Sequence, residues 1–147
     1  MNIKIIDSPL DLKLSGVANK THDPAKSYGD ELIELLDVVW KNVKSRSIPT
    51  TGINHAVYGD QGELFAGVVI KDPGVMPDEL EAREIVLTRY AYYKYVGPYS
   101  GLPQAHKEMV EEIDRLGLVR KAPLIEIYGH WTEDPAKLET ELIYALR

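Results

Sequence analysis

The residues best suited to chemistry are a glutamate and the tyrosines around it in the second half of the chain. Glu126 lies between two isoleucines in the segment 124–128, which reads Leu-Ile-Glu-Ile-Tyr. Alternation of this kind predicts a β-strand on which residues 124, 126 and 128 share one face. A carboxylate enclosed by aromatic rings loses hydration, and a bound cation restores the balance. Glu126 therefore predicts a pocket for a flat, apolar, cationic molecule.

The tyrosine content favours a binding surface over a dry core. The chain has nine tyrosines and a single phenylalanine. Each tyrosine ring offers apolar area together with a hydroxyl that needs a partner. Tyr90 and Tyr92 share a strand face with Lys94, and Tyr58 and Tyr128 occupy matching faces of their strands. The alternative that stays open is a glutamate that points into solvent from the open face of an antiparallel sheet.

The elements that must position these residues follow the order strand–helix–strand–strand, twice. In the first half, the periodicities predict a strand over 10–17, a helix over 31–43 capped by Ser27 or Asp30, and strands over 53–58 and 64–70. In the second half, they predict a long strand over 84–96, a helix over 103–116, and strands over 124–131 and 141–146. We expect the face that carries Ile125 and Ile127 to lie under the helices.

The repeated order predicts a duplicated α+β domain with internal repeats at about 3–71 and 80–147, separated by a Pro- and Gly-containing segment over 71–79. Val57-Tyr58-Gly59 aligns with Ile127-Tyr128-Gly129, and Glu63-Leu64 with Glu141-Leu142. The alignment puts Ala56 at the position of Glu126. We expect antiparallel sheets, helices on one side, and a ligand cleft between the repeats that carries one carboxylate.

Composition bounds the rest. The 147 residues suffice for one domain, 1–147, and the absence of cysteine excludes disulfides and thiolate chemistry. The net charge of −6, without a basic cluster, argues against nucleic acid as a direct partner. No apolar run is long enough to span a bilayer, and the N-terminus lacks a secretion signal, so we expect no membrane and a cytoplasmic protein. The spacing of the four histidines suggests no metal site, and we expect no cofactor.

Several segments resemble the GyrI-like effector-binding domain, which also occurs at the C-terminus of some AraC-type and MerR-type multidrug-sensing regulators. The specific motif is Tyr-Ala-Tyr-Tyr-Lys-Tyr-Val-Gly-Pro-Tyr over 90–99, followed by a helix and by Pro-Leu-Ile-Glu-Ile-Tyr over 123–128. The closing segment 141–144 looks like the last strand of the family. In the first half, residues 14–17 and the pair Val-Trp at 39–40 are similar to its pattern.

The resemblance implies an aromatic cleft between the repeats, with a glutamate at the position of Glu126 that meets cationic ligands. It also implies Tyr144 as an aromatic of the pocket, and Tyr58, Tyr90, Tyr92, Tyr128 and Trp40 as further lining residues. The first strand follows Met1 closely, so we expect a stand-alone form without a helix-turn-helix.

The leading expectation is a protein that captures or senses hydrophobic, cationic or aromatic compounds. The resemblance implies one alternative, a hydrolase of reactive, cyclopropane-bearing toxins, in which Glu126 acts as general base on water and Tyr128 or Tyr144 orients the substrate. Another is a protein-interaction module that inhibits or regulates a partner, and a homodimer also stays open. The hydrolase would use the same residues as the binding protein, so the sequence alone does not separate the two.

Overall fold

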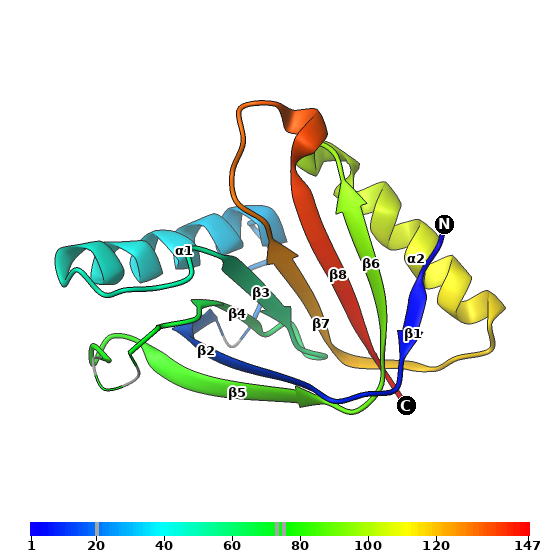
Figure 1. Cartoon of the computed structure of the whole chain (residues 1–147), viewed down its shortest axis with the longest axis horizontal. Coiled ribbons are helices and arrows are strands. Elements are labelled where there is room, and N and C mark those ends of the chain that lie inside the picture. Colours follow the sequence, from blue (N-terminus) through cyan, green and yellow to red (C-terminus); the bar gives the residue numbers. More distant parts are fainter. Residues whose placement is uncertain (20, 73, 75) are drawn as a thin grey trace.

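The computed structural model describes residues 1–19, 21–72, 74 and 76–147, and within them eight strands form one antiparallel sheet with two α-helices on one face (Figure 1). The strand order is β1-β6-β8-β7-β3-β4-β2-β5. The strands are β1 (Lys4–Ile6), β2 (Leu10–Asn19), β3 (Asn54–Tyr58), β4 (Leu64–Val68), β5 (Glu81–Leu87), β6 (Tyr90–Val96), β7 (Arg120–Tyr128) and β8 (Glu139–Leu146). The helices are α1 (Tyr28–Ser45) and α2 (Leu102–Arg115), with short 3₁₀ turns η1 (Tyr99–Gly101) and η2 (Pro135–Lys137).

The strand order confirms the predicted duplication. The first repeat is β2–α1–β3–β4 and the second is β6–α2–β7–β8, and they join edge to edge where β3 pairs with β7. At the outer edges lie β1 and β5. Of the expected boundary segment 71–79, Pro73 and Val75 lie outside the described residues.

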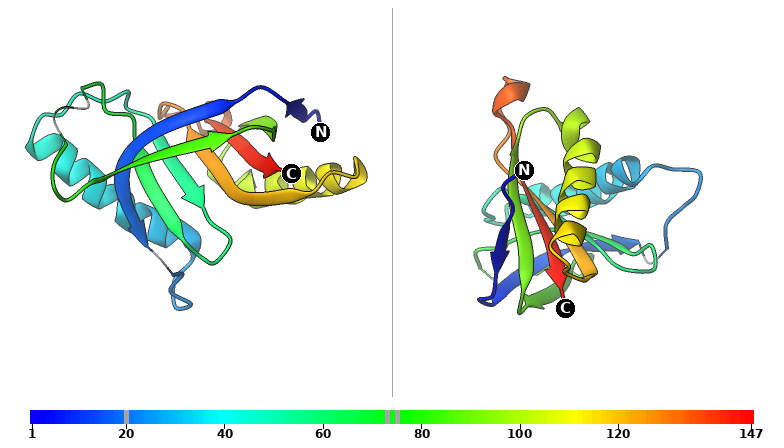
Figure 2. Two further views of the ribbon diagram at one scale, coloured as in Figure 1. Left: turned by 90° about the horizontal axis from the view of Figure 1, so that it is seen from below. Right: turned by 90° about the vertical axis from the view of Figure 1, so that its right-hand side faces the viewer.

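The α-helices repeat one another with an offset of 70 residues. Ser27 caps α1 by accepting a hydrogen bond from the backbone N–H of Asp30, at 3.1 Å. The buried apolar stripe of α1 is Leu32, Leu35, Val39 and Val43, and that of α2 is Leu102, Ala105, Met109 and Ile113. Both helices lie on the same face of the sheet (Figure 2). Because each stripe packs on that face, the interior surfaces of the repeats correspond position by position. No described helix is both long and apolar enough to cross a membrane.

The expectation about which face the helices cover was wrong. Leu124 and Tyr128 pack toward α2 and Glu126 shares their face, whereas Ile125 belongs to a core cluster on the other face. That cluster joins residues from β2 through β8, including Leu14 and Phe65. The sheet is strongly curved (Figure 2), so its helix-free face buries its own apolar side chains. Alternation along a strand assigns two faces but does not say which face receives the helix.

The predicted strand over 84–96 is two strands, and β1 was not predicted at all. Leu87 and Tyr90 are buried in the same core cluster, although a continuous strand would place them on opposite faces. The chain therefore breaks between them: β5 pairs with β2 in the first repeat, and β6 with β8 in the second.

The register of the sheet corrects one part of the repeat alignment. Ala56 pairs directly with Glu126 across β3 and β7, as the equivalence of these positions about a central axis requires. Tyr58 pairs with Leu64, however, while Tyr128 pairs with Thr140. Thr140, not Leu142, is therefore the counterpart of Leu64. The short Glu-Leu match used for the alignment was a coincidence two residues out of register.

Gly16 provides a test of this register. A Cβ atom at this position would overlap the carbonyl oxygen of Ala66 and lie 2.7 Å from the Cα of Gly67, so β2 and β4 have no room for a side chain there. We expect Gly16→Ala to lower the free energy of unfolding by about 1–3 kcal/mol, measured by urea denaturation. Gly29→Ala is the control, because its Cβ would meet only the Ser27 hydroxyl at 3.8 Å. Equal stability of the Gly16 variant and the wild type would contradict the register.

Candidate functional site

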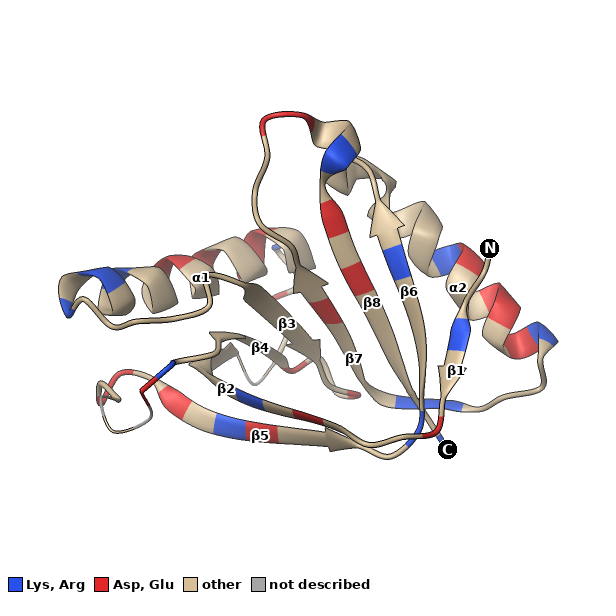
Figure 3. Cartoon of the chain, in the orientation of Figure 1, with Lys and Arg blue, Asp and Glu red and all other residues tan. Residues whose placement is uncertain are grey.

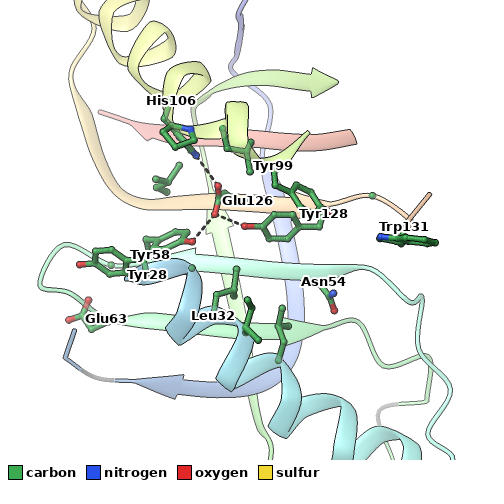
Figure 4. A pocket seen from close by; sticks show the side chains of 18 of the residues that line it. Tyr28, Leu32, Asn54, Tyr58, Glu63, Tyr99, His106, Glu126, Tyr128 and Trp131 are labelled. Carbon is green, nitrogen blue, oxygen red and sulfur yellow. Dashed lines mark hydrogen bonds and ion pairs between the residues drawn. The ribbon is translucent and has the colours of Figure 1, made fainter. Parts of the chain in front are cut away.

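Glu126 is the centre of a buried hydrogen-bond network on the helix-covered face of the sheet (Figure 4). The residue is 5% exposed. Its Oε1 accepts hydrogen bonds from the hydroxyls of Tyr58 at 2.7 Å and Tyr128 at 2.8 Å, and its Oε2 lies 2.8 Å from Nε2 of His106. Donors therefore reach both oxygens of this carboxylate.

The duplication explains how these groups meet. Because Ala56 and Glu126 pair across β3 and β7, the pseudo-twofold axis runs between them. Tyr58 and Tyr128 stand two residues beyond this pair on their respective strands, which places their rings on either side of the axis. Both hydroxyls then reach the same carboxylate oxygen.

His106 extends the network into α2. Its Nδ1 lies 2.7 Å from the hydroxyl of Tyr144 on β8, so the imidazole bridges Tyr144 and Glu126. A neutral ring with its proton on Nε2 donates to Glu126 and accepts from Tyr144, and a protonated ring donates to both. Either form leaves the ring nitrogens satisfied.

The network holds Glu126 in its ionised form. Burial alone would raise the pKa of Glu126, but the hydrogen bonds from His106, Tyr58 and Tyr128 and the attraction of His106 outweigh it, so the pKa lies below the ordinary value. Burial and the neighbouring carboxylate raise the pKa values of Tyr58 and Tyr128, which therefore remain hydroxyl donors. Burial also raises the pKa of Tyr144 to about 12.

A cavity of about 870 Å³ opens beside this network, between α1, α2 and the central strands. Many of its lining residues are pairs related by the 70-residue offset: Leu32 and Leu102, Ile33 and Pro103, Leu36 and His106, Asn54 and Leu124, Tyr58 and Tyr128, Gly59 and Gly129. The cavity therefore lies on the pseudo-twofold axis, between the repeats. Its size is within the range of sites for small molecules.

Aromatic rings form the ends of the cavity. Tyr28 packs edge-on against Tyr58, and Tyr99 packs edge-on against Tyr128, each with ring centroids 5.7 Å apart. Trp131 follows β7 and is 73% exposed at the rim, where Figure 4 shows it beyond Tyr128. A large apolar side chain so exposed beside a cavity is available to cover a bound molecule.

The structure brings together some of the sequence-predicted residues and separates others. Glu126, Tyr58 and Tyr128 line the cavity. Tyr144 and Trp40 are not among the described residues that line it, but each contacts one that does: Tyr144 contacts His106, and Trp40 donates its indole N–H to Oδ1 of Asn54 at 2.7 Å. Within the described part of the chain, Tyr90 and Tyr92 do not line it: they lie on the helix-free side of the sheet.

Sequence reasoning missed His106, Tyr28 and Tyr99. The spacing of the four histidines indicates no metal site and therefore gives no reason to select His106. Its position gave a usable signal, since it lies one residue after Ala105 and one turn after Leu102 on the buried stripe of α2. The same offset that matches the helices puts it opposite Leu36, inside the expected cleft.

A second hollow, of about 510 Å³, lies on the other face of the sheet and is lined by His55, Lys94, Glu139 and Glu141 among others. Its charges are paired within the protein: Lys94 lies 3.2 Å from Glu139, and Glu141 accepts from Tyr92 at 2.6 Å. Figure 3 shows a basic position on β6 beside acidic positions on β8. Among the described residues, no group of three or more potential ligands is placed to hold a metal ion.

Comparison with solved structures shows the same fold in proteins of low sequence identity. The chain matches EcmrR in its complex with DNA at a TM-score of 0.71 and 16% identity, covering 99% of this chain but only 56% of EcmrR. It matches SAV2435 bound to tetraphenylphosphonium at 0.65 and 16%, covering 100% and 94% of the two chains. It matches a hydrolase encoded by lin2189 from Listeria innocua at 0.59 and 13%, covering 99% and 91%.

The chain matches no curated protein sequence. The model of the GyrI-like small molecule binding domain, in contrast, matches residues 1–147 in full. With its duplicated fold and its axial cavity, the chain belongs to the GyrI-like small molecule binding domain family.

Proposed function

We propose that this protein binds a flat, hydrophobic, cationic molecule in the axial cavity, with the carboxylate of Glu126 as its counter-charge. The observation that carries the proposal is a carboxylate, 5% exposed and contacted by two tyrosine hydroxyls and an imidazole, at the wall of an aromatic-lined cavity of about 870 Å³. A cation in the cavity recovers the solvation that Glu126 lost on burial. The tyrosine rings add about 0.5–2 kcal/mol each if the cation stacks on their faces.

The shape of the site favours tolerance over fine discrimination. Because the hydroxyls of Tyr58 and Tyr128 donate to Glu126, these residues present mainly ring surface to a ligand. A site with few free directional groups distinguishes poorly between apolar cations of similar size. Tetraphenylphosphonium, the molecule bound to SAV2435, is an aromatic cation of this chemical kind and supports its use as a probe.

Hydrolysis is the second candidate, and the fold of the Listeria innocua hydrolase keeps it open. It would require Glu126 to take a proton from water. A general base works best when its pKa is near the operating pH, whereas the donors around Glu126 lower its pKa below the ordinary value. His106 could act as the base only by giving up its contact with Glu126 or Tyr144. The geometry therefore supports binding better than turnover.

Glu126→Gln tests the charge. The amide keeps the size of the side chain and can still accept from a tyrosine, but it carries no charge. We expect the affinity for tetraphenylphosphonium, measured by isothermal titration calorimetry at pH 7.5, to fall roughly 10- to 100-fold, since a hydrogen-bonded or paired charge contributes about 1.5–3 kcal/mol.

Glu141→Gln is the matched control, because Glu141 also accepts from a tyrosine hydroxyl and lies on the same sheet, but on its other face. It removes the same net charge from the protein without changing the cavity. We expect its affinity to stay within twofold of the wild type. If both variants bind as the wild type does, the counter-charge role of Glu126 is wrong; if both lose affinity equally, only the overall charge matters.

A time course separates binding from turnover. We expect aromatic cations, and neutral aromatic electrophiles that carry a cyclopropane ring, to be recovered chemically unchanged after prolonged incubation with the protein, as measured by mass spectrometry. Appearance of a product 18 mass units heavier, at a rate that Glu126→Gln abolishes, would instead establish hydrolysis at this site.

A further inference from the structure

The repeats are matched in fold but not in the charge that they bring to the cavity. At the 70-residue offset, His106 occupies the position of Leu36, and Glu126 occupies the position of Ala56. The acid and its histidine partner thus both belong to the second repeat, while the first repeat presents apolar groups at the same places. An imidazole fixed 2.8 Å from the carboxylate determines whether the pair carries a net charge.

His106 is built into the site and yet accessible from the cavity. It lines the cavity, and its side chain is 21% exposed whereas that of Glu126 is 7% exposed. The groups that face the cavity from the elements around it are Glu126 and Tyr128 on β7, Tyr58 on β3, Tyr99 on η1, Tyr28 on α1 and Glu63 on the β3–β4 turn. Tyr144 on β8 contacts the ring from behind.

Histidine is the residue type that changes charge most readily near neutral pH, and His106 is the histidine among the described residues that line the cavity. When His106 is protonated, the pair with Glu126 is neutral and the carboxylate already has its cation. When His106 is neutral, the pair carries one negative charge that a ligand can balance. The protonation state of this one ring therefore determines whether the cavity wall is neutral or carries one negative charge.

We propose that His106 sets the charge of the cavity: its protonated form is the internal counter-ion of Glu126, and an aromatic cation binds by displacing that proton. This inference rests on the proposed function. No covalent step is involved, and the proton leaves His106 for solvent as the cation enters. Because the cation prefers the neutral ring, protons compete with it, and affinity for the cation falls as pH is lowered.

The test measures tetraphenylphosphonium affinity by calorimetry at pH 5.5 and at pH 8.0. We expect the wild-type affinity to be about 10-fold higher at pH 8.0, within the usual range of such couplings. Titrations near pH 6.5 in two buffers of different ionisation enthalpy should also show net proton release on binding. A wild-type affinity that changes less than twofold, with no proton release, would overturn the proposal.

His106→Gln is the decisive variant, because its amide can still donate to Glu126 but cannot take up a proton. We expect the ratio of its affinities at pH 8.0 and pH 5.5 to fall below about threefold, and proton release on binding to disappear. His106→Leu, which carries the residue that the first repeat has at this position, is a second variant and should also lose the pH dependence of the wild type. The same pH dependence in both variants as in the wild type would overturn the role of His106.

His22 is the matched control. This histidine stacks on Tyr28 at the edge of the cavity, with ring centroids 3.9 Å apart, and is paired with Glu31. We expect His22→Gln to keep the full pH dependence of binding. If this variant alone lost the pH dependence, His22 and not His106 would be its cause, and the assignment to His106 would be wrong. Failure of tetraphenylphosphonium to bind at either pH defeats the proposed function itself, whereas pH-independent binding defeats only the inference about His106.

Discussion

A carboxylate taken out of water must be compensated, and the architecture around Glu126 follows from that constraint. Burying an ionised carboxyl without partners costs several kcal/mol, so the protein either neutralises it or surrounds it with donors. Here Tyr58, Tyr128 and His106 donate to it from β3, β7 and α2. The carboxylate therefore ties together both repeats and a helix. It can also stay charged next to an open cavity. A fully solvated carboxylate would attract a cation less strongly, because water screens its charge.

The duplication positions the tyrosines around Glu126 by using one local arrangement in both repeats. The axis between Ala56 and Glu126 brings Tyr58 and Tyr128 symmetrically to one oxygen, so a single arrangement of strand and tyrosine serves twice. Departures from this symmetry then make one side of the cavity polar. An alanine replaced by glutamate and a leucine replaced by histidine convert one half of an apolar hollow into a polar wall, while the half formed by α1 stays apolar. A ligand that is hydrophobic over most of its surface and charged at one place matches such a cavity.

Sequence alone predicted the two repeats and the helices and strands within them, apart from β1 and the break between β5 and β6, because period-2 and period-3.6 patterns are local properties of the chain. It also predicted Glu126, Tyr58 and Tyr128, whose shared face follows from alternation. It failed for Tyr90 and Tyr92, because the break between β5 and β6 and the curvature of the sheet decide which face is enclosed. It missed His106 because the contact with Glu126 joins residues 20 positions apart, and only the buried stripe of α2 combined with the repeat offset indicates it.

The proposed cation binding depends on the charge of the buried Glu126, and a pH titration of its side-chain carboxyl carbon by ¹³C NMR measures this charge directly. We expect the unliganded protein to show a midpoint below 4.5, the ordinary value for a glutamate, so that the group is fully ionised at neutral pH. A midpoint well above that value, with a carboxyl that remains protonated near pH 7, would contradict the account, because the cavity would then hold no charge for a cation to balance.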